Sequence, residues 1–241
     1  MESNINKQKS PTNLLVQIGT WSKRRLSSNP VWQYRVSIGL KRDLSAEAPH
    51  YQASLPVKVR ELRGSDIPRL LPLNCPALSR TERQEISLRR ALASRNVPHC
   101  FVAIDTSNER PCFMQWAFDT SSNEFVHQFF RGRFPRIKTG QALLENAYTP
   151  PEYRGRGIMP DAMNQIALIL REKSIHELIT FVDYENTPSL KGCQRAGFYP
   201  YLTRRDLSLL HFWKRRIFSP LAESTSHNPH SLTSFSPETS S

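Results

Sequence analysis

The sequence of 241 residues has few cysteines, few glycines and no long apolar run. Its four cysteines, Cys75, Cys100, Cys112 and Cys193, show no Cys-x-x-Cys spacing. This argues against a zinc site and a disulfide framework and favours reduced thiols. No apolar stretch reaches the roughly 18 residues that a membrane-spanning helix needs. The first apolar stretch, 14–18, is short and contains a glutamine, so no signal peptide is predicted and we expect a cytoplasmic protein without a metal site.

Positive charge is in clear excess, with 33 lysines and arginines against 21 acidic residues and a formal net charge of +12. The basic residues form small groups along the whole chain rather than one basic arm. Such a balance suits nucleic acid, an anionic membrane surface, a phosphate-bearing cofactor or simply a basic surface. Because no helix-turn-helix, zinc finger or aromatic RNA platform is recognisable, nucleic-acid binding is the less favoured interpretation.

Composition divides the chain into three parts. Residues 1–55 form an N-terminal extension whose alternation of apolar and polar residues over 31–40 predicts one half-buried strand. We expect this strand to pack on the main domain; covering an acceptor groove or forming a homodimer are alternatives. Residues 56–222 are expected to form one catalytic-type domain. Over 223–241 polar residues and prolines predominate, which predicts a disordered tail because little apolar area is available for burial.

Within 56–222 the pattern alternates between strands and helices. Strands are predicted at 57–62, 100–105, 112–118, 142–149 and 177–183, and helices at 67–73, 79–94, 159–170 and 187–196. The apolar piece 125–130 is ambiguous and is interpreted as a further strand or an acceptor-binding loop. The order of elements predicts an α/β protein.

The strand 142–149 ends in a turn that holds Arg154, Gly155, Arg156 and Gly157 and then continues into a helix. Glycines in such a turn allow backbone N–H groups to converge, and the start of a helix adds positive partial charge. Arginine guanidinium groups suit phosphate oxygens. The segment therefore predicts an anion-binding turn.

Two spaced motifs carry a resemblance to a known family. Pro151-Glu152-Tyr153-Arg154-Gly155-Arg156-Gly157-Ile158 resembles the cofactor signature of the GNAT superfamily of acyl-CoA-dependent N-acetyltransferases, and Asn186 followed by Gly197-Phe198 resembles its second motif. The resemblance covers 57–215 and is most specific over 142–198. It implies a mixed, central, splayed β-sheet flanked by helices.

The resemblance also implies a site and a reaction. The acceptor, a small molecule or a protein, would supply an amine that attacks the thioester of acetyl-CoA or another acyl-CoA directly in a ternary complex. The edge of the strand 142–149 would hold the pantetheine arm near Ala147, Tyr148 and Thr149, and Asn186 would contact the arm or stabilise the splayed strands. The diphosphate would lie on the backbone N–H groups of the turn, contributed by Arg154, Gly155, Arg156, Gly157, Ile158 and Met159.

Two residues depart from the family pattern. Met159 stands where a glycine is usual, and Cys193 stands where many relatives carry the tyrosine that protonates the departing coenzyme A. Cys193 is either this acid or a small core residue; Tyr199 is another candidate for the acid, as are Tyr184 and Tyr201. Glu145 is a candidate general base, as is Asp183, and a capping or salt-bridging role is the favoured alternative for either carboxylate.

The sequence thus predicts an acyltransferase of the GNAT type. The main alternative is a GNAT-fold module that binds acyl-CoA with weak or no turnover, which Met159 and Cys193 favour.

Overall fold

The computed structural model describes residues 32–47, 49, 51–72, 78–95, 97, 99–209 and 213–221. Its centre is an eight-stranded sheet in the order β2-β3-β4-β5-β6-β1-β7-β8. Neighbouring strands are antiparallel except β5 and β6, which are parallel. The strands are β1 (Trp32–Asp43), β2 (Val57–Glu61), β3 (Cys100–Asp105), β4 (Arg110–Phe118), β5 (Gln141–Tyr148), β6 (Glu177–Asp183), β7 (Tyr199–Leu209) and β8 (Trp213–Pro220).

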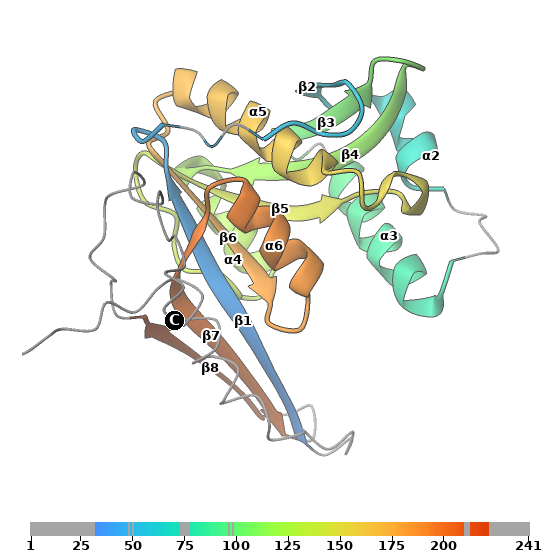
Figure 1. Cartoon of the computed structure of the whole chain (residues 1–241). Coiled ribbons are helices and arrows are strands. Elements are labelled where there is room, and N and C mark those ends of the chain that lie inside the picture. The colour runs from blue at the N-terminus through green and yellow to red at the C-terminus, as the bar shows by residue number, and fades with distance from the viewer. Residues whose placement is uncertain are drawn as a thin grey trace, which may run out of the picture.

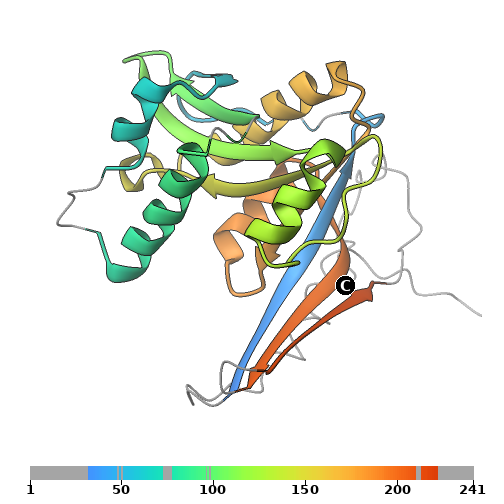
Figure 2. The same ribbon diagram turned by 180° about the vertical axis from the view of Figure 1, so that it is seen from behind.

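Helices cover both faces of this sheet and confirm the predicted fold class (Figure 1). The α-helices are α2 (Ile67–Leu70), α3 (Arg80–Ala93), α4 (Asn123–Phe129), α5 (Ile158–Glu172) and α6 (Thr187–Arg195). Short 3-10 helices are η1 (Gly64–Asp66), η2 (Thr120–Ser122) and η3 (Pro151–Tyr153). Figure 1 looks onto α5 and α6, and Figure 2, from behind, shows α3 and α4 on the opposite face.

Each face buries its own hydrophobic cluster. The cluster on the α5 side includes Ile158, Met163, Ile166, Leu170 and Cys193. The cluster on the α3 side includes Ile86, Leu92, Trp116, Val126 and Phe130. Since successive side chains of a strand point to opposite faces, β3, β4, β5 and β6 each contribute to both clusters.

The prediction of a strand or a loop over 125–130 is wrong, because these residues lie in helix α4 and directly after it. Asp119 begins the turn before it, because its carboxylate accepts a hydrogen bond from the backbone N–H of Ser121 at 3.0 Å. Phe125 then stacks on Phe118 with ring centroids 6.1 Å apart, and on Phe129 at 5.3 Å. Tertiary packing of aromatic rings decides the helical conformation of a segment whose local pattern was ambiguous.

The strand predicted at 31–40 exists, and it lies inside the sheet. β1 pairs with β6 through Ser37–Asp43 and with β7 through Trp32–Lys41. Residues 37–40 are buried, so this half of the strand is covered on both faces rather than half-buried. The division of the chain at 55/56 stays a prediction, although β1 shares one sheet with the residues after it.

The connector from β1 to β2 crosses the start of α5. The backbone N–H of Ser54 donates to the carbonyl of Arg156 at 2.9 Å, and the N–H of Ala53 donates to the Asp161 carboxylate at 2.8 Å. The side chain of Asn164 donates to the carbonyl of Pro49. These bonds hold the connector beside the predicted anion-binding turn.

Some expectations fall on residues outside the described ranges, namely 1–31, the tail 223–241 and Cys75. Cys100, Cys112 and Cys193 are buried free thiols. No helix in the described part of the chain is long and apolar enough to cross a membrane.

Candidate active site

The parallel strands β5 and β6 pair over only three residues each. Gln141, Ala142 and Leu143 lie opposite Glu177, Leu178 and Ile179, and beyond these pairs the two strands diverge. A cavity of about 230 Å³ lies where they separate. It is lined by Arg89, Gln115, Arg133, Phe134, Glu145, Asn146, Ala147, Met159, Thr180, Phe181, Val182, Asp183, Asn186, Ser189, Cys193 and Arg204.

The lining comes from both sides of the sheet. Met159 lies on α5, and Ser189 and Cys193 lie on α6, which covers one face. Phe134 belongs to the α3-side cluster and Arg89 to α3 itself, on the opposite face. Residues from both faces of the sheet therefore border the cavity between β5 and β6.

An irregularity in β5 helps to separate the strands. The register between β4 and β5 shifts, since Met114 lies opposite Tyr148 and Trp116 opposite Glu145. Asn146, inside the shifted segment, has φ of 56°, a left-handed conformation that few residues other than glycine adopt. This is a β-bulge, which re-aims the groups around it.

A buried arginine fixes the bulge from the α3 side. Arg89 donates to the carbonyl of Asn146 at 3.4 Å and to that of Ala147 at 3.1 Å. Its guanidinium also lies 4.9 Å from the ring centroid of Tyr148 and pairs with Glu85 at 3.2 Å. Because both carbonyls are bonded by one guanidinium, the conformation of the bulge depends on α3.

Glu145 directly precedes the bulge and borders the cavity. Leu143 packs in the α3-side cluster and Leu144 in the α5-side cluster, so the alternation of the strand places Glu145 on the α3 side. Its Oε2 accepts a 3.3 Å hydrogen bond from the N–H of Asn146, whereas its Oε1 is buried without a partner at full hydrogen-bond geometry, although the backbone of Phe181 is near enough to lower the pKa of the carboxyl group. Burial raises the pKa of Glu145 to about 7, against the opposite effect of Arg204 and Arg133.

A chain of polar contacts crosses three strands beside Glu145. Asp183 on β6 accepts a hydrogen bond from Ser37 Oγ on β1 at 2.7 Å, and Ser37 Oγ accepts one from Arg204 on β7 at 2.8 Å. Arg204 also pairs with Asp206 at 3.0 Å and donates to the carbonyl of Arg133 at 3.1 Å. The inserted strand β1 thus supplies the hydroxyl that joins the cavity residues of β6 and β7.

The predicted anion-binding turn follows β5 and runs from η3 to α5. Gly155 and Gly157 have φ of 78° and 72°, and Gly157 is the residue before the first turn of α5. The N–H groups of Ile158 and Met159 in that turn have no partner within the helix. Two left-handed glycines followed by a helix N-terminus form a suitable cradle for a diphosphate.

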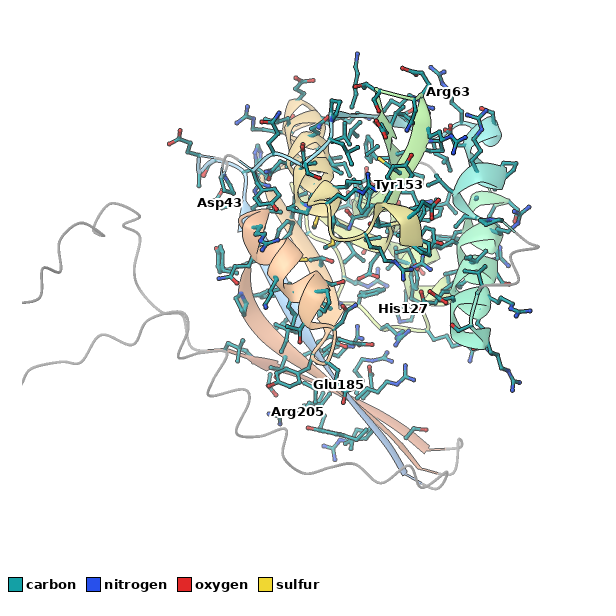
Figure 3. The ribbon with its side chains drawn as sticks, turned by 45° about the vertical axis from the view of Figure 1, so that its right-hand side comes forward. Asp43, Arg63, His127, Tyr153, Glu185 and Arg205 are labelled. Atoms are coloured by element: carbon teal, nitrogen blue, oxygen red, sulfur yellow. The ribbon has the colours of Figure 1, made fainter. Side chains whose placement is uncertain are left out.

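The arginines of this turn also have protein partners. Arg154 donates to the carbonyl of Thr149 at 3.1 Å and pairs with Glu82 at 3.4 Å. Arg156 lies over the ring of Tyr153, which Figure 3 labels at the start of the turn. Both arginine side chains therefore already contact other protein groups.

Tyr51 in the connector touches the same turn. A Cβ atom added at Gly157 would lie 2.8 Å from Tyr51 Oη. Arg195 at the end of α6 donates to this hydroxyl at 3.5 Å and lies over the ring. The connector therefore brings the phenol group of Tyr51 to the turn, and no motif in the sequence marks this residue.

The structure separates the three predicted catalytic residues. Glu145 and Cys193 both line the cavity, whereas Tyr199 does not and is 43% exposed at the start of β7, beside Lys41. Cys193 packs in the α5-side cluster, and burial raises the pKa of its thiol to about 12. Among the residues that line the cavity, none is a tyrosine.

The predicted cofactor residues lie along one path. Ala147, Met159 and Asn186 line the cavity, Tyr148 is buried beneath Arg89, and the turn follows after Thr149. Asn186 caps α6 by accepting from the N–H of Ser189 at 3.2 Å. Met159 fills the space beside Gly192, where an added Cβ would lie 3.2 Å from its sulfur.

Several residues were not found from the sequence, namely Arg89, Gln115, Arg133 and Arg204, which line the cavity, and Ser37, which bonds the lining residues Asp183 and Arg204. No local motif marks them, because an arginine on a helix or strand is usually a solvated residue. Within the described ranges no group of three side chains that could hold a metal ion is present.

One family model matches part of the chain. The model of the acetyltransferase (GNAT) family matches residues 83–198. Among curated proteins, no sequence matches the chain.

Solved structures show distant similarity. A GCN5-related N-acetyltransferase from Sphaerobacter thermophilus is 15% identical with a TM-score of 0.49, over 89% of this chain and 59% of that protein. A GNAT family acetyltransferase from Brucella melitensis, in complex with acetyl-CoA, is 14% identical with a TM-score of 0.35, over 52% of this chain and 75% of its own. The ribosomal-protein-S5-alanine acetyltransferase from Vibrio fischeri is 16% identical with a TM-score of 0.38, over 73% and 96%.

This chain spans about three fifths of the length of the Sphaerobacter protein. The matched segment 83–198 contains most of α3, the bulge of β5, the glycine turn and α6, and all of the residues that line the cavity except Arg204 lie within it. Residues 83–198 are therefore identified as an acetyltransferase domain of the GNAT family.

Proposed function

We propose that this protein transfers an acetyl or other short acyl group from acyl-CoA to an amine. The observation that carries the proposal is Glu145, a carboxylate at the splay of β5 and β6 with one buried, unpartnered oxygen and a pKa near neutrality. A general base works best when its pKa lies near the working pH. Glu145 meets this requirement because its burial raises the pKa of its carboxyl group to about 7.

The residues of the turn fit a diphosphate. A Cβ added at Gly155 would meet no atom within 4 Å, so the surface of the turn is open there, and the first N–H groups of α5 are available. Ala147 and Asn186, between the turn and the cavity, would contact the pantetheine arm. The bound acyl-CoA supplies an activated thioester carbonyl, whose C–S bond breaks as the C–N bond to the amine forms.

Glu145 takes the first proton from the ammonium group of the acceptor, which makes the nitrogen nucleophilic. The bulge residues, held by Arg89, fix the backbone on which the reacting groups are oriented. The nitrogen loses its second proton as the amide forms, and that proton ends on the thiol product. Glu145 then returns its proton to water.

Cys193 is a packing residue in this proposal. With its pKa raised to about 12 it is a much weaker acid than an ordinary thiol with a pKa of about 8.5, so it is poorly suited to protonate a thiolate. Tyr199 lies outside the cavity lining and receives no role.

The alternative is a module that binds acyl-CoA without turnover. It is favoured by Cys193 at the position of the usual acid and by Met159, which lines the cavity beside α6. Both functions require binding of acyl-CoA, but only the acyltransferase transfers the acyl group to an amine.

Thioester cleavage with acetyl-CoA and a panel of amines tests the proposal. We expect amine-dependent release of free thiol, with kcat/KM rising with pH through an apparent pKa of about 7. Glu145→Gln should lower kcat about 10²–10⁴-fold with little change in acetyl-CoA affinity.

Glu124→Gln, an exposed carboxylate that pairs with Arg136 away from the cavity, is the matched control and should keep full activity. Binding of acetyl-CoA without any amine-dependent thiol release would instead support the binding module. Equal activity of Glu145→Gln and the native protein would remove Glu145 from the mechanism.

A further inference from the structure

We propose that the acceptor is a small amine that also carries a carboxylate, and that Arg133 holds this carboxylate while Glu145 receives the amine. The inference rests on the proposed function, because it concerns the acceptor end of the same cavity. Nothing in the family match specifies an acceptor. The argument comes from the charges and the unpartnered polar atoms of this cavity.

Three arginines line the cavity, and two of them are already engaged. Arg89 bonds the two bulge carbonyls and Glu85. Arg204, which is 3% exposed, bonds Asp206, Ser37 and the carbonyl of Arg133. These two side chains therefore serve to hold the protein structure.

Arg133 is different. Among the described residues, its guanidinium has neither a hydrogen-bond partner nor an ion-pair partner. It nevertheless lies close enough to Arg204 to lower the pKa of that arginine, and close enough to Glu145 to affect its carboxyl group. Two like charges at one cavity are unfavourable until an anion lies between or beside them.

The loop that carries Arg133 is anchored on both sides. Arg216 donates to the carbonyl of Arg131 at 3.0 Å, and Arg204 donates to that of Arg133 at 3.1 Å. Phe134 packs edge-on against Phe130, with centroids 5.1 Å apart, and lies 5.4 Å from Phe181. A fixed backbone presents Arg133 to the cavity with little ordering entropy left to lose on binding.

Buried polar atoms without partners define what the cavity can accept. Gln115 Oε1 and Glu145 Oε1 are acceptors, and Asn146 Nδ2 is a donor; all three are buried and unpartnered, and their residues line the cavity. An ammonium group satisfies the two acceptors, and a carboxylate satisfies the amide donor together with Arg133. A molecule with both groups therefore offers a partner of the right kind to each of these atoms and to Arg133.

Size and charge narrow the class further. A volume of about 230 Å³ admits a small molecule or one projecting residue, and not a folded partner. One unpaired guanidinium matches a single negative charge, which favours a carboxylate over a doubly charged phosphate. The expected acceptor is an amino-acid-like compound.

Calorimetric binding to the full chain tests this without requiring turnover. The probes are glycine, β-alanine and γ-aminobutyrate. Each is compared with the compound in which a neutral carboxamide replaces the carboxylate, with and without coenzyme A. We expect at least one carboxylate to bind about 10-fold or more tightly than its amide. Arg133→Met should abolish this difference, and Arg133→Lys should restore part of it.

Arg136→Met is the matched control, because Arg136 lies on the same loop but is 70% exposed and pairs with Glu124. Equal binding of all three acids and their amides, an unchanged preference in Arg133→Met, or tighter binding of phosphoethanolamine would overturn the proposal. Failure of the proposed function is a separate result: preferential binding of an acid with no thiol release under any condition.

Discussion

Glu145 is expected to destabilise the folded protein above neutral pH. Its folded pKa of about 7 lies above the ordinary carboxyl value of 4.5, so the folded state binds the proton more tightly than the unfolded chain. The contribution of Glu145 to the free energy of unfolding is fully present below pH 4.5 and is lost as the pH rises through 7. The whole shift corresponds to about 3 kcal/mol, and we expect about 2 kcal/mol because the residue keeps some solvent contact.

Glu145→Gln removes this dependence. At pH 8 the variant should unfold with a free energy about 2 kcal/mol higher than the native protein, and at pH 4 the two should agree. Urea unfolding at both values measures the difference. A variant that is less stable at pH 8 would show that the carboxylate is compensated in the folded state, contrary to its unpartnered oxygen.

Gly155 and Gly157 offer a matched pair in the turn. Both have positive φ, so alanine at either position is strained by about 1 kcal/mol. Only at Gly157 would the new Cβ also meet a neighbour, the hydroxyl and ring of Tyr51 at 2.8–3.3 Å. Gly157→Ala should therefore cost more stability than Gly155→Ala, by about 1 kcal/mol or more.

Adding Tyr51→Ala to each glycine variant isolates the contact. The second substitution should close most of the gap between the two glycine variants in thermal or urea unfolding. A gap that persists would assign the cost to backbone strain alone.

At the scale of elements, β1 is the strand whose loss should matter most. It is hydrogen bonded to β6 on one side and β7 on the other, and Ser37 joins Asp183 to Arg204. Deleting residues 1–43 removes both ladders and leaves the strands of the cavity without this connection. We expect insoluble or unfolded protein, measured by circular dichroism and expression in the soluble fraction.

A deletion of residues 1–30 is the control, since it ends before β1. This shorter variant should unfold at a temperature close to that of the full chain. A folded, active protein without residues 1–43 would show that β6 and β7 pair directly when β1 is absent.

The elements show what could be predicted from sequence. Strands such as Glu177–Asp183 and the helix with its Ser79–Glu82 capping box follow from local patterns, because period and cap are local properties. The position of β1 between β6 and β7 and the helix at Asn123–Phe129 depend on distant partners. A pattern of alternation states that a strand exists, not which strands lie beside it.

The same distinction holds for the site. The glycine turn and Asn186 lie in contiguous motifs and were predicted, whereas Arg89, Arg133 and Arg204 reach the cavity from separate elements. Glu145 was found as a candidate because it lies on a predicted strand; its unusual pKa arises only from burial in the folded chain.

At the scale of the whole molecule, the net charge of +12 should act on the rate of cofactor association. Acyl-CoA carries several negative charges on its phosphates, so a positive protein attracts it over a distance. Raising the ionic strength from about 0.01 M to about 0.15 M shortens the screening length from about 30 Å to about 8 Å. We expect the association rate to fall several-fold, measured by stopped-flow binding.

Acetyl-pantetheine, which has the thioester but lacks the phosphates, separates steering from contact at the site. Its kcat/KM should change little over the same range of salt, because it has no net charge to be attracted. If both thioesters lose the same fraction of their rate, salt acts on the fold or on the reacting groups rather than on the approach of the anion. The excess of basic residues would then have another role than the capture of acyl-CoA.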